Sequence, residues 1–302
     1  MFKSKNSMSR ALVRRETTAG YLFLLPSLFF FVTFVLYPMF LCLYTSFFDS
    51  NMGKNAVDVF VGLGNYKELF QDKLFLGALK NTVVIVVVAV PTVCAFSLWV
   101  ATAIYDMKPA LTSAFRCIFY LPVVTGSVAV TVVWKWMYNS RYGVFNYLFK
   151  SLGIIDQNIN WLGDARFALW CIILILFTTS VGQPIVLYVS ALGNVDHSLV
   201  EAAQVDGANR RQVFWKIKWA QIMPTTLYIL IITTINSFQC FALIQLLTSG
   251  GPTHSTDTIM YYIYYTAFKL YRYGYGNAMG VVLMVIIAVL SAVQFKLGQQ
   301  SG

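Results

Sequence analysis

Six long apolar runs constrain this chain more than any other feature of its sequence. A helix needs about 20 apolar residues to cross the hydrocarbon core of a bilayer. The runs that reach this length are 21–48, 82–105, 115–138, 167–192, 225–247 and 278–295. Charge is almost absent from them, and Lys135, near the end of the third run, can extend its ammonium to the interface. The sequence therefore predicts an all-α membrane protein with six transmembrane helices.

The charge content excludes several classes of soluble protein. Of 302 residues, 58% are hydrophobic and 11% are charged, against about 25% charged in a typical soluble domain. This composition excludes an ordinary cytosolic enzyme, a disordered protein and a nucleic-acid binder. The net charge of +10 then reflects basic segments that orient membrane helices. The first run is too long for the apolar region of a signal peptide and lacks a small-residue cleavage site, so we expect it to be a retained helix.

Two basic clusters indicate the orientation. The tail at residues 1–20 and the connection after the fourth run carry Lys3, Lys5, Arg10, Arg14, Arg15, Arg210, Arg211, Lys216 and Lys218. Cytoplasmic segments are enriched in such residues, and six spans place both termini on that side. The connections 49–80, 139–166 and 248–277 are then outside, although they also carry basic residues.

Catalytic, metal-binding and ATP-binding patterns are missing from the sequence. There is no GxxxxGK[ST] loop for ATP, and His197 and His254 are expected in loops with no carboxylate or serine arranged for proton relay. The cysteines lie in apolar runs and lack the spacing of metal ligands, so we expect them to be small buried side chains. They are Cys42, Cys94, Cys117, Cys171 and Cys240. No carboxylate lies within a span, which disfavours an ion-coupled transporter. We expect a protein that is not an enzyme and holds no metal.

The connection at 193–224 is the most informative segment outside the runs. A helical reading places the small residues Ala202 and Ala203 on one face, where another surface can approach closely. Gly207 can adopt a positive φ and end this helix, and a second short helix is expected from Asn209 towards Lys218. The spacing alone fits either a helical projection for a partner's groove or an amphipathic connector resting on lipid headgroups.

Several motifs resemble the permease subunits of binding-protein-dependent ABC importers for carbohydrates. EAAxxDGAxxxxxFxxI at residues 201–217 resembles the coupling loop of that family. FVGLGNY at 60–66, LKNT at 79–82, YLP at 120–122 and LLTSGGP at 246–252 resemble its carbohydrate branch. The chain is similar to maltose, multiple-sugar and glycerol-phosphate permeases from about residue 20 onward. One departure is Trp219-Ala220 where the family usually has a proline; here the proline is Pro224.

The resemblance implies a fold, partners and a division of labour. The fold would be that of a type I ABC importer permease in a bacterial or archaeal cytoplasmic membrane. Its segments would be a tail at 1–20, a first helix and outer loop at 21–76, a five-helix core at 77–297 and a tail at 298–302. Partners would be a second homologous permease subunit, an ATPase dimer that binds the ATP and Mg²⁺, a substrate-binding protein, a carbohydrate and membrane lipid, with no nucleic acid.

The resemblance also assigns roles to two groups of residues. Docking on the ATPase would involve Glu201, Ala202, Ala203, Asp206, Gly207 and Ala208. The turn at Gly250, Gly251 and Pro252 would lie where the binding protein docks. This chain itself would catalyse no covalent step.

Polar residues inside the fourth and fifth runs are the candidate substrate contacts. They are Thr179, Ser180 and Gln183, beside a break at Gly182 and Pro184, and Thr233, Asn236, Ser237 and Cys240, whose spacing is one helical face. Such groups either line a water-filled path or join helices by hydrogen bonds. No cation lies on this face, which favours a neutral oligosaccharide over glycerol-3-phosphate. The tyrosines between 261 and 275 favour an interfacial aromatic belt over a sugar-stacking platform.

Overall fold

The computed structural model describes residues 3–50 and 58–299, with side chains described for 15–50 and 58–298. Most of the basic side chains of the tail at 1–20 therefore lie outside the described part. The elements in chain order are α1 (Lys3–Phe31), a π-helical turn (Val32–Leu36), α2 (Tyr37–Thr45), β1 (Phe48–Asp49), β2 (Val59–Phe60), α3 (Gly64–Gln71), α4 (Lys73–Tyr105), α5 (Pro109–Val124), α6 (Ser127–Met137), α7 (Val144–Ser151), α8 (Ala168–Ser180), α9 (Gly182–Gly193), α10 (His197–Val205), α11 (Arg210–Val213), a π-helical turn (Phe214–Lys218), α12 (Trp219–Phe238), α13 (Ala242–Leu247), α14 (Ile259–Tyr264), a π-helical turn (Tyr265–Lys269) and α15 (Tyr273–Gln299).

Five continuous helical stretches are long and apolar enough to span a membrane, and a bent pair makes a sixth. The six predicted spans are confirmed when α5 and α6 are counted as one. The third run, predicted as one span at 115–138, consists of two helices, α5 and α6, that meet at 96°. The bend follows from extended backbone at Thr125 and Gly126, which ends α5 just after Pro122. α4 begins at Lys73, so the boundary drawn between residues 76 and 77 falls inside this helix.

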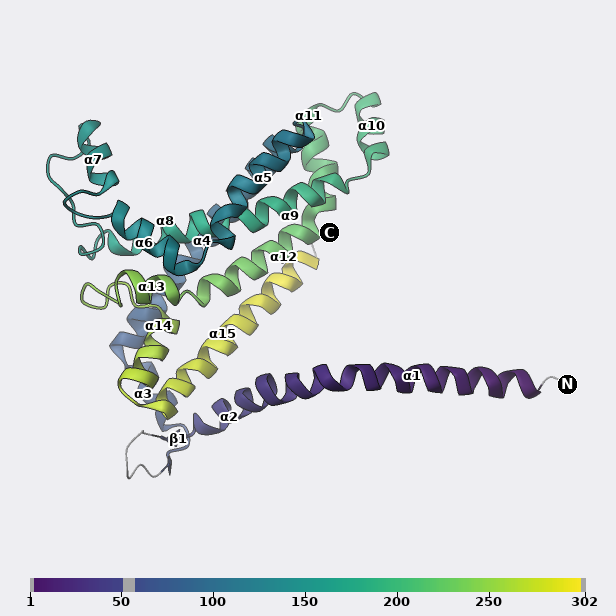
Figure 1. The fold of residues 1–302 in the computed structure, drawn as a ribbon, viewed down its shortest axis with the longest axis horizontal. Helices are drawn as coiled ribbons and strands as arrows, with labels where there is room; N and C mark the ends of the chain where they lie inside the picture. The colour runs from purple at the N-terminus through teal and green to yellow at the C-terminus, as the bar shows by residue number, and fades with distance from the viewer. Residues whose placement is uncertain (1–2, 51–57, 300–302) are drawn as a thin grey trace.

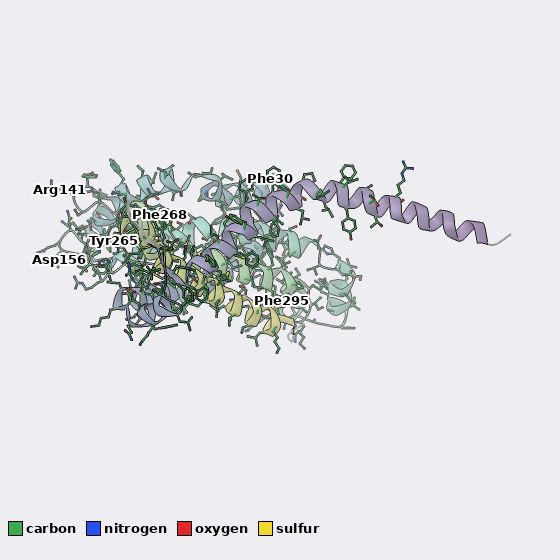
Figure 2. All side chains as sticks on the ribbon, turned by 90° about the horizontal axis from the view of Figure 1, so that it is seen from below. Phe30, Arg141, Asp156, Tyr265, Phe268 and Phe295 are labelled. Carbon is green, nitrogen blue, oxygen red and sulfur yellow. The ribbon has the colours of Figure 1, made fainter. Side chains whose placement is uncertain are left out.

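The first span stands away from the other helices. α1 points away from the bundle (Figure 1). Within the first span, α2 is the part that packs against α15. Figure 2 shows Phe30 on this isolated helix, and its side chain is 59% exposed. The apolar surface of α1 is therefore left to lipid or to another chain.

The core of the bundle lies between α4, α9 and α12. Ile185, Tyr188 and Ile222 are fully buried there, and Ser97 of α4 donates a hydrogen bond of 3.2 Å to the Val181 carbonyl. A Cβ at Gly182 would collide with the Phe119 carbonyl of α5, so this glycine allows α5 and α9 to pack closely. The expected break at Gly182 is present as the division between α8 and α9.

Asp72 ties together the ends of three helices that are distant in sequence. Its carboxylate caps α4 by accepting hydrogen bonds from the backbone N–H groups of Leu74 (2.8 Å) and Phe75 (3.3 Å). It also accepts hydrogen bonds from the hydroxyls of Tyr262 (2.7 Å) and Tyr275 (2.9 Å). Partial burial raises the pKa of the Asp72 carboxyl, but these four hydrogen bonds outweigh it and leave the pKa below its ordinary value. These two tyrosines are buried structural contacts, so the aromatic-belt interpretation is wrong for them.

The predicted inner and outer segments lie at opposite ends of the molecule. α10, α11 and the last turns of α15 form one end, which we call the α10 end (Figure 1). α3, α7, α13 and α14 form the other, called the α14 end, where Figure 2 shows Arg141 and Asp156 at the tip. The candidate substrate contacts lie on helices that run between the two ends, except Cys240, which follows the end of α12.

Candidate functional site

A cavity of about 160 Å³ lies between α5, α8, α9 and α12. Its lining includes five of the seven predicted path residues: Thr179, Ser180, Gln183, Thr233 and Asn236. Val123 closes one side, and Tyr228, Ile229 and Ile232 extend the α12 face. Two separate apolar runs therefore contribute their polar residues to one hollow inside the bundle.

The other two predicted residues lie outside this cavity. Cys240 lines a neighbouring hollow of about 340 Å³, which shares Thr179 with the first and also includes Gln239. Ser237 lines neither hollow and is 2% exposed. The reason is geometric, because one residue along a helix is a rotation of about 100°, which carries Ser237 off the face that holds Asn236.

The side-chain amides of Gln183 and Asn236 are available for a ligand. Both residues are exposed to the cavity, and neither amide makes a hydrogen bond within the described residues. Hydrogen bonds that join two helices occur elsewhere. For example, the Gln294 amide donates a hydrogen bond of 2.9 Å to the Thr234 hydroxyl. Thr179 instead donates to the Ile175 carbonyl of its own helix (3.0 Å). The lining thus carries two free amides and the half-exposed phenol of Tyr228.

Arg116 is a charged residue that sequence reasoning overlooked inside the third run. It lies on α5 seven residues before Val123, on the same helical face and about 10.5 Å along the axis. Its Nε is buried and has no hydrogen-bond partner among the described residues. The run's high average hydropathy concealed this single charge. A cation therefore lies on the same helix as Val123 of the cavity lining, although none lies on the predicted face of α12.

The connection between α9 and α12 forms an exposed helical projection at the α10 end. Asp196 caps α10 through the Ser198 N–H (2.9 Å), and Gly207, at φ +83°, ends the turn after α10. The N–H of Gly207 donates to the Gln204 carbonyl (3.0 Å), and that of Ala208 donates to the Ala203 carbonyl (2.9 Å). The helix end expected at Gly207 is confirmed.

The segment after Gly207 differs from the expected separate short helix. Asn209 and Gln212 form a reciprocal cap that starts α11. α11 then continues through the π-helical turn at Phe214–Lys218 directly into α12. The helix keeps its backbone hydrogen bonding here because the proline lies further on, at Pro224 inside α12.

Four of the six predicted docking residues are exposed on this projection. Glu201, Ala202, Asp206 and Gly207 are exposed, while Ala203 and Ala208 are half-buried. Val205 is 88% exposed and Leu199 is 51% exposed. The sequence prediction did not include Val205, although an apolar residue between Gln204 and Asp206 in a polar turn was a visible signal.

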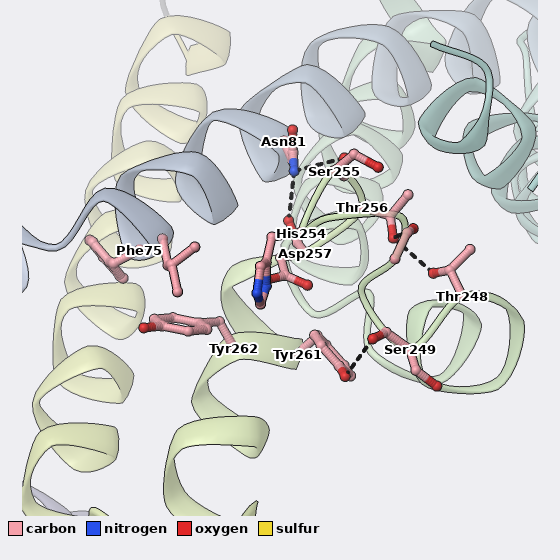
Figure 3. Close-up of polar contacts among 12 residues, drawn as sticks. Phe75, Asn81, Thr248, Ser249, His254, Ser255, Thr256, Asp257, Tyr261 and Tyr262 are labelled. Atoms are coloured by element: carbon pink, nitrogen blue, oxygen red, sulfur yellow. Dashed lines mark hydrogen bonds and ion pairs between the residues drawn. The ribbon is translucent and has the colours of Figure 1, made fainter. Parts of the chain in front are cut away.

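The glycine-rich segment after α13 is a closely packed loop at the α14 end (Figure 3). The Asn81 amide donates to the carbonyls of Ser255 (3.1 Å) and Asp257 (3.0 Å), and the Thr248 and Thr256 hydroxyls are 2.8 Å apart. Gly250 has φ +84°, and a Cβ there would collide with the Asp257 carboxylate. These contacts fix the turn that contains Gly251 and Pro252.

His254 is not the simple solvated histidine that the sequence predicts. Its Nδ1 lies 2.7 Å from Asp257 Oδ2, and Asp257 is 1% exposed. Burial raises the pKa of the Asp257 carboxyl, and the contact with His254 opposes that rise. This contact joins two residues of the same packed loop, three positions apart in the chain.

Metal coordination finds no support in the part of the chain that the structure describes. Within residues 3–50 and 58–299 no group of three or more His, Cys, Asp or Glu side chains is arranged to hold a metal ion. Among the free thiols, Cys171 and Cys240 are buried and Cys117 is exposed. The expectation that the cysteines are buried is therefore correct for only some of them.

Comparisons with known proteins cover nearly the whole chain. The family described as "binding-protein-dependent transport system inner membrane component" matches residues 21–299. The lactose transport system permease protein LacF of Rhizobium radiobacter is 33% identical over 94% of this chain and 95% of its own length. The multiple sugar-binding transport system permease protein MsmF of Streptococcus mutans is 32% identical over 93% of this chain and 95% of its own length.

A solved structure shares the fold. A chain of the bacterial alginate ABC transporter, crystallised with its alginate pentasaccharide-bound periplasmic protein, superposes with a TM-score of 0.80. It is 24% identical, and the match covers 93% of each chain. The fold of this chain has therefore already been seen in a solved structure.

Proposed function

Because the chain belongs to the family of binding-protein-dependent transport system inner membrane components, we propose that it is the permease subunit of an ATP-driven importer. The cargo is a sugar or oligosaccharide, and the membrane is the cytoplasmic membrane of a bacterium or archaeon. Two similar permeases carry lactose and multiple-sugar transport in their names. The observation that carries the proposal is the cavity with free Gln183 and Asn236 amides, since sugar hydroxyls are recognised by such hydrogen-bonding groups.

The cavity and the exposed projection together suggest an alternating-access mechanism. A cavity that opens in turn to each side requires a ligand or partner with different affinity for the two states. The ATPase dimer, which binds ATP and Mg²⁺, supplies that difference through Glu201, Ala202, Ala203, Asp206, Gly207 and Ala208. The α10 end and both termini face the cytoplasm, in agreement with the basic residues of the connection at 193–224. This chain moves cargo without a covalent step.

The α14 end faces the outside in this arrangement and receives the substrate-binding protein. Gly250, Gly251 and Pro252 contribute to that docking surface, held by the packed loop around Asp257. The other half of the path comes from a second homologous permease subunit. Residues 1–20 and 298–302 are tails, 21–76 carry the first helix and outer loop, and 77–297 form the core, with the loop at 193–224.

A glycerol-3-phosphate permease is the alternative within the same family. Arg116, two helical turns from the cavity, is the observation that favours an anionic cargo. An ion-coupled secondary transporter is disfavoured, because a lone transporter has no need of the exposed α10 projection.

The class of transporter is tested by purification and the cargo by uptake. We expect the full chain to copurify with an ABC ATPase, and the reconstituted complex to hydrolyse ATP faster when a loaded binding protein is added. Radiolabelled oligosaccharide and glycerol-3-phosphate are compared as cargo in proteoliposomes. Purification without an ATPase would contradict the assignment as an ABC importer. Uptake of glycerol-3-phosphate alone would contradict only the proposal that the cargo is a sugar.

Gln183→Ala and Asn236→Ala are expected to weaken cargo binding in the cavity. Each removes hydrogen bonds worth about 0.5–1.5 kcal/mol, so we expect KM for uptake to rise roughly 3–10-fold with each substitution. Gln245→Ala, a half-buried amide on α13 outside the cavity, is the matched control and should leave KM unchanged. Unaltered KM in both path variants, with normal assembly, would refute the proposed contacts.

A further inference from the structure

A second hollow, separate from the substrate cavity, lies at the α10 end. Its volume is about 370 Å³. Its walls come from the last turn of α4, the end of α9, α10, α11 and the π-helical turn before α12: Thr102, Tyr105, Asp106, Leu192, Val195, His197, Val200, Gln204, Arg210, Val213, Phe214 and Lys218. It therefore joins the ends of two membrane spans to the projection that carries Glu201.

The lining of this hollow carries more positive than negative charge. Arg210 and Lys218 contribute two full positive charges, against the single carboxylate of Asp106. Neither cation forms an ion pair within 4.0 Å among the described residues. Lys218 Nζ lies 5.5 Å from the centre of the Tyr105 ring, which holds the ammonium at the wall. The uncompensated charge favours an anionic ligand.

Part of the wall is apolar, and the hollow lies where the spans end. Val195, Val200 and Val213 form part of that wall. The neighbouring helices that could span a membrane end at Tyr105 and Gly193, and in the proposed orientation this places the opening near the headgroups of the leaflet that the α10 end faces. A cavity with cations beside an apolar wall at this depth matches a ligand that has a phosphate at one end and hydrocarbon at the other.

We propose that this hollow binds the phosphate of an anionic phospholipid headgroup, with Arg210 and Lys218 as its ligands. The apolar wall receives the glycerol backbone and the start of the acyl chains, which a free phosphate ion lacks. The bound lipid contacts α4 and the α10–α11 connection at once, so the lipid composition of the leaflet influences the position of the projection. This inference needs only the membrane setting and stands whichever cargo the cavity carries.

Native mass spectrometry of the full chain, titrated with phosphatidylglycerol in detergent, tests the proposal. Each cation near an anionic lipid contributes roughly fivefold in affinity. Arg210→Gln with Lys218→Gln should therefore weaken the first bound phosphatidylglycerol at least tenfold. Arg211→Gln with Lys216→Gln is the matched control, because those cations lie on the same segment but outside the hollow, and it should change that affinity less than twofold.

Further variants and ligands separate a specific site from general effects. Asp106→Asn removes the repelling carboxylate and should tighten phosphatidylglycerol binding, a gain that misfolding cannot produce. Zwitterionic phosphatidylcholine should bind with equal weakness to all variants. Competition by millimolar inorganic phosphate would support a phosphate site and overturn the lipid as its source. Equal losses in the two double variants would overturn the site itself.

Discussion

Gly207→Pro is expected to abolish transport while leaving the chain inserted in the membrane. Gly207 adopts φ +83° and donates its N–H to the Gln204 carbonyl at 3.0 Å. Proline fixes φ near −65° and has no N–H, so the turn between α10 and α11 cannot form. The surface that presents Glu201 and Asp206 is lost, and the ATPase can no longer drive the cavity between its two states. Uptake in proteoliposomes should fall to background.

Gly153→Pro is the matched control for this substitution. Gly153 also has a positive φ (+67°) and donates its N–H to the carbonyl three residues earlier, that of Lys150 (3.0 Å), but it lies just after α7 at the other end. It should retain ATPase copurification and most of the uptake. Normal uptake by Gly207→Pro, or equal loss in both variants, would contradict a coupling role for the α10 turn.

Glu201→Lys tests the same surface without disturbing the backbone. Glu201 is exposed on α10, so the change should leave the fold and membrane insertion intact. Truncating one partner of a desolvated charged contact costs about 2–5 kcal/mol, and reversing the charge adds repulsion. Copurification of the ATPase should therefore drop strongly. Wild-type recruitment together with wild-type uptake would refute the assignment of Glu201.

The spans were predictable because burial in lipid demands long apolar runs, and such runs are visible in sequence. The shape of the third span was not. Pro122 and Gly126 were present in the run, but a proline or glycine in a membrane helix permits a straight helix as well as a bend. The 96° turn between α5 and α6 comes with extended backbone at Thr125 and Gly126, a local conformation that the presence of a proline and a glycine does not specify.

The candidate site was predictable where helical spacing determines it. The i, i+3 pattern brought Thr233 and Asn236 to one cavity, and the break at Gly182 brought Gln183 to it from the other run. Ser237 was misplaced because spacing defines a broad stripe and cannot say which edge of the stripe faces the hollow. Nothing near Tyr262 or Tyr275 in the sequence indicates that their partner is Asp72, because Asp72 lies 190 and 203 positions away from them.

Asp72→Ala is expected to lower the free energy of unfolding by roughly 3–4 kcal/mol. Loss of a helix N-cap costs about 1 kcal/mol, and each phenol left without its acceptor costs about 1–1.5 kcal/mol. Because the carboxylate holds α4, α14 and α15 together, the loss should also speed thermal inactivation of the reconstituted transporter. Asp164→Ala is the control, because that carboxylate pairs with Arg166 on an exposed loop, and it should cause no measurable change.

The pH dependence separates a charged role of Asp72 from a merely steric one. The folded pKa of Asp72 lies below its ordinary value, so the native state favours the ionised form. Its contribution is complete above the unfolded value of about 3.9 and is lost as the pH falls through the lower folded value. The stability difference between wild type and Asp72→Ala should therefore be constant near neutral pH and shrink below about pH 4. A difference that stays constant into that acidic range would show that Asp72 acts through shape alone.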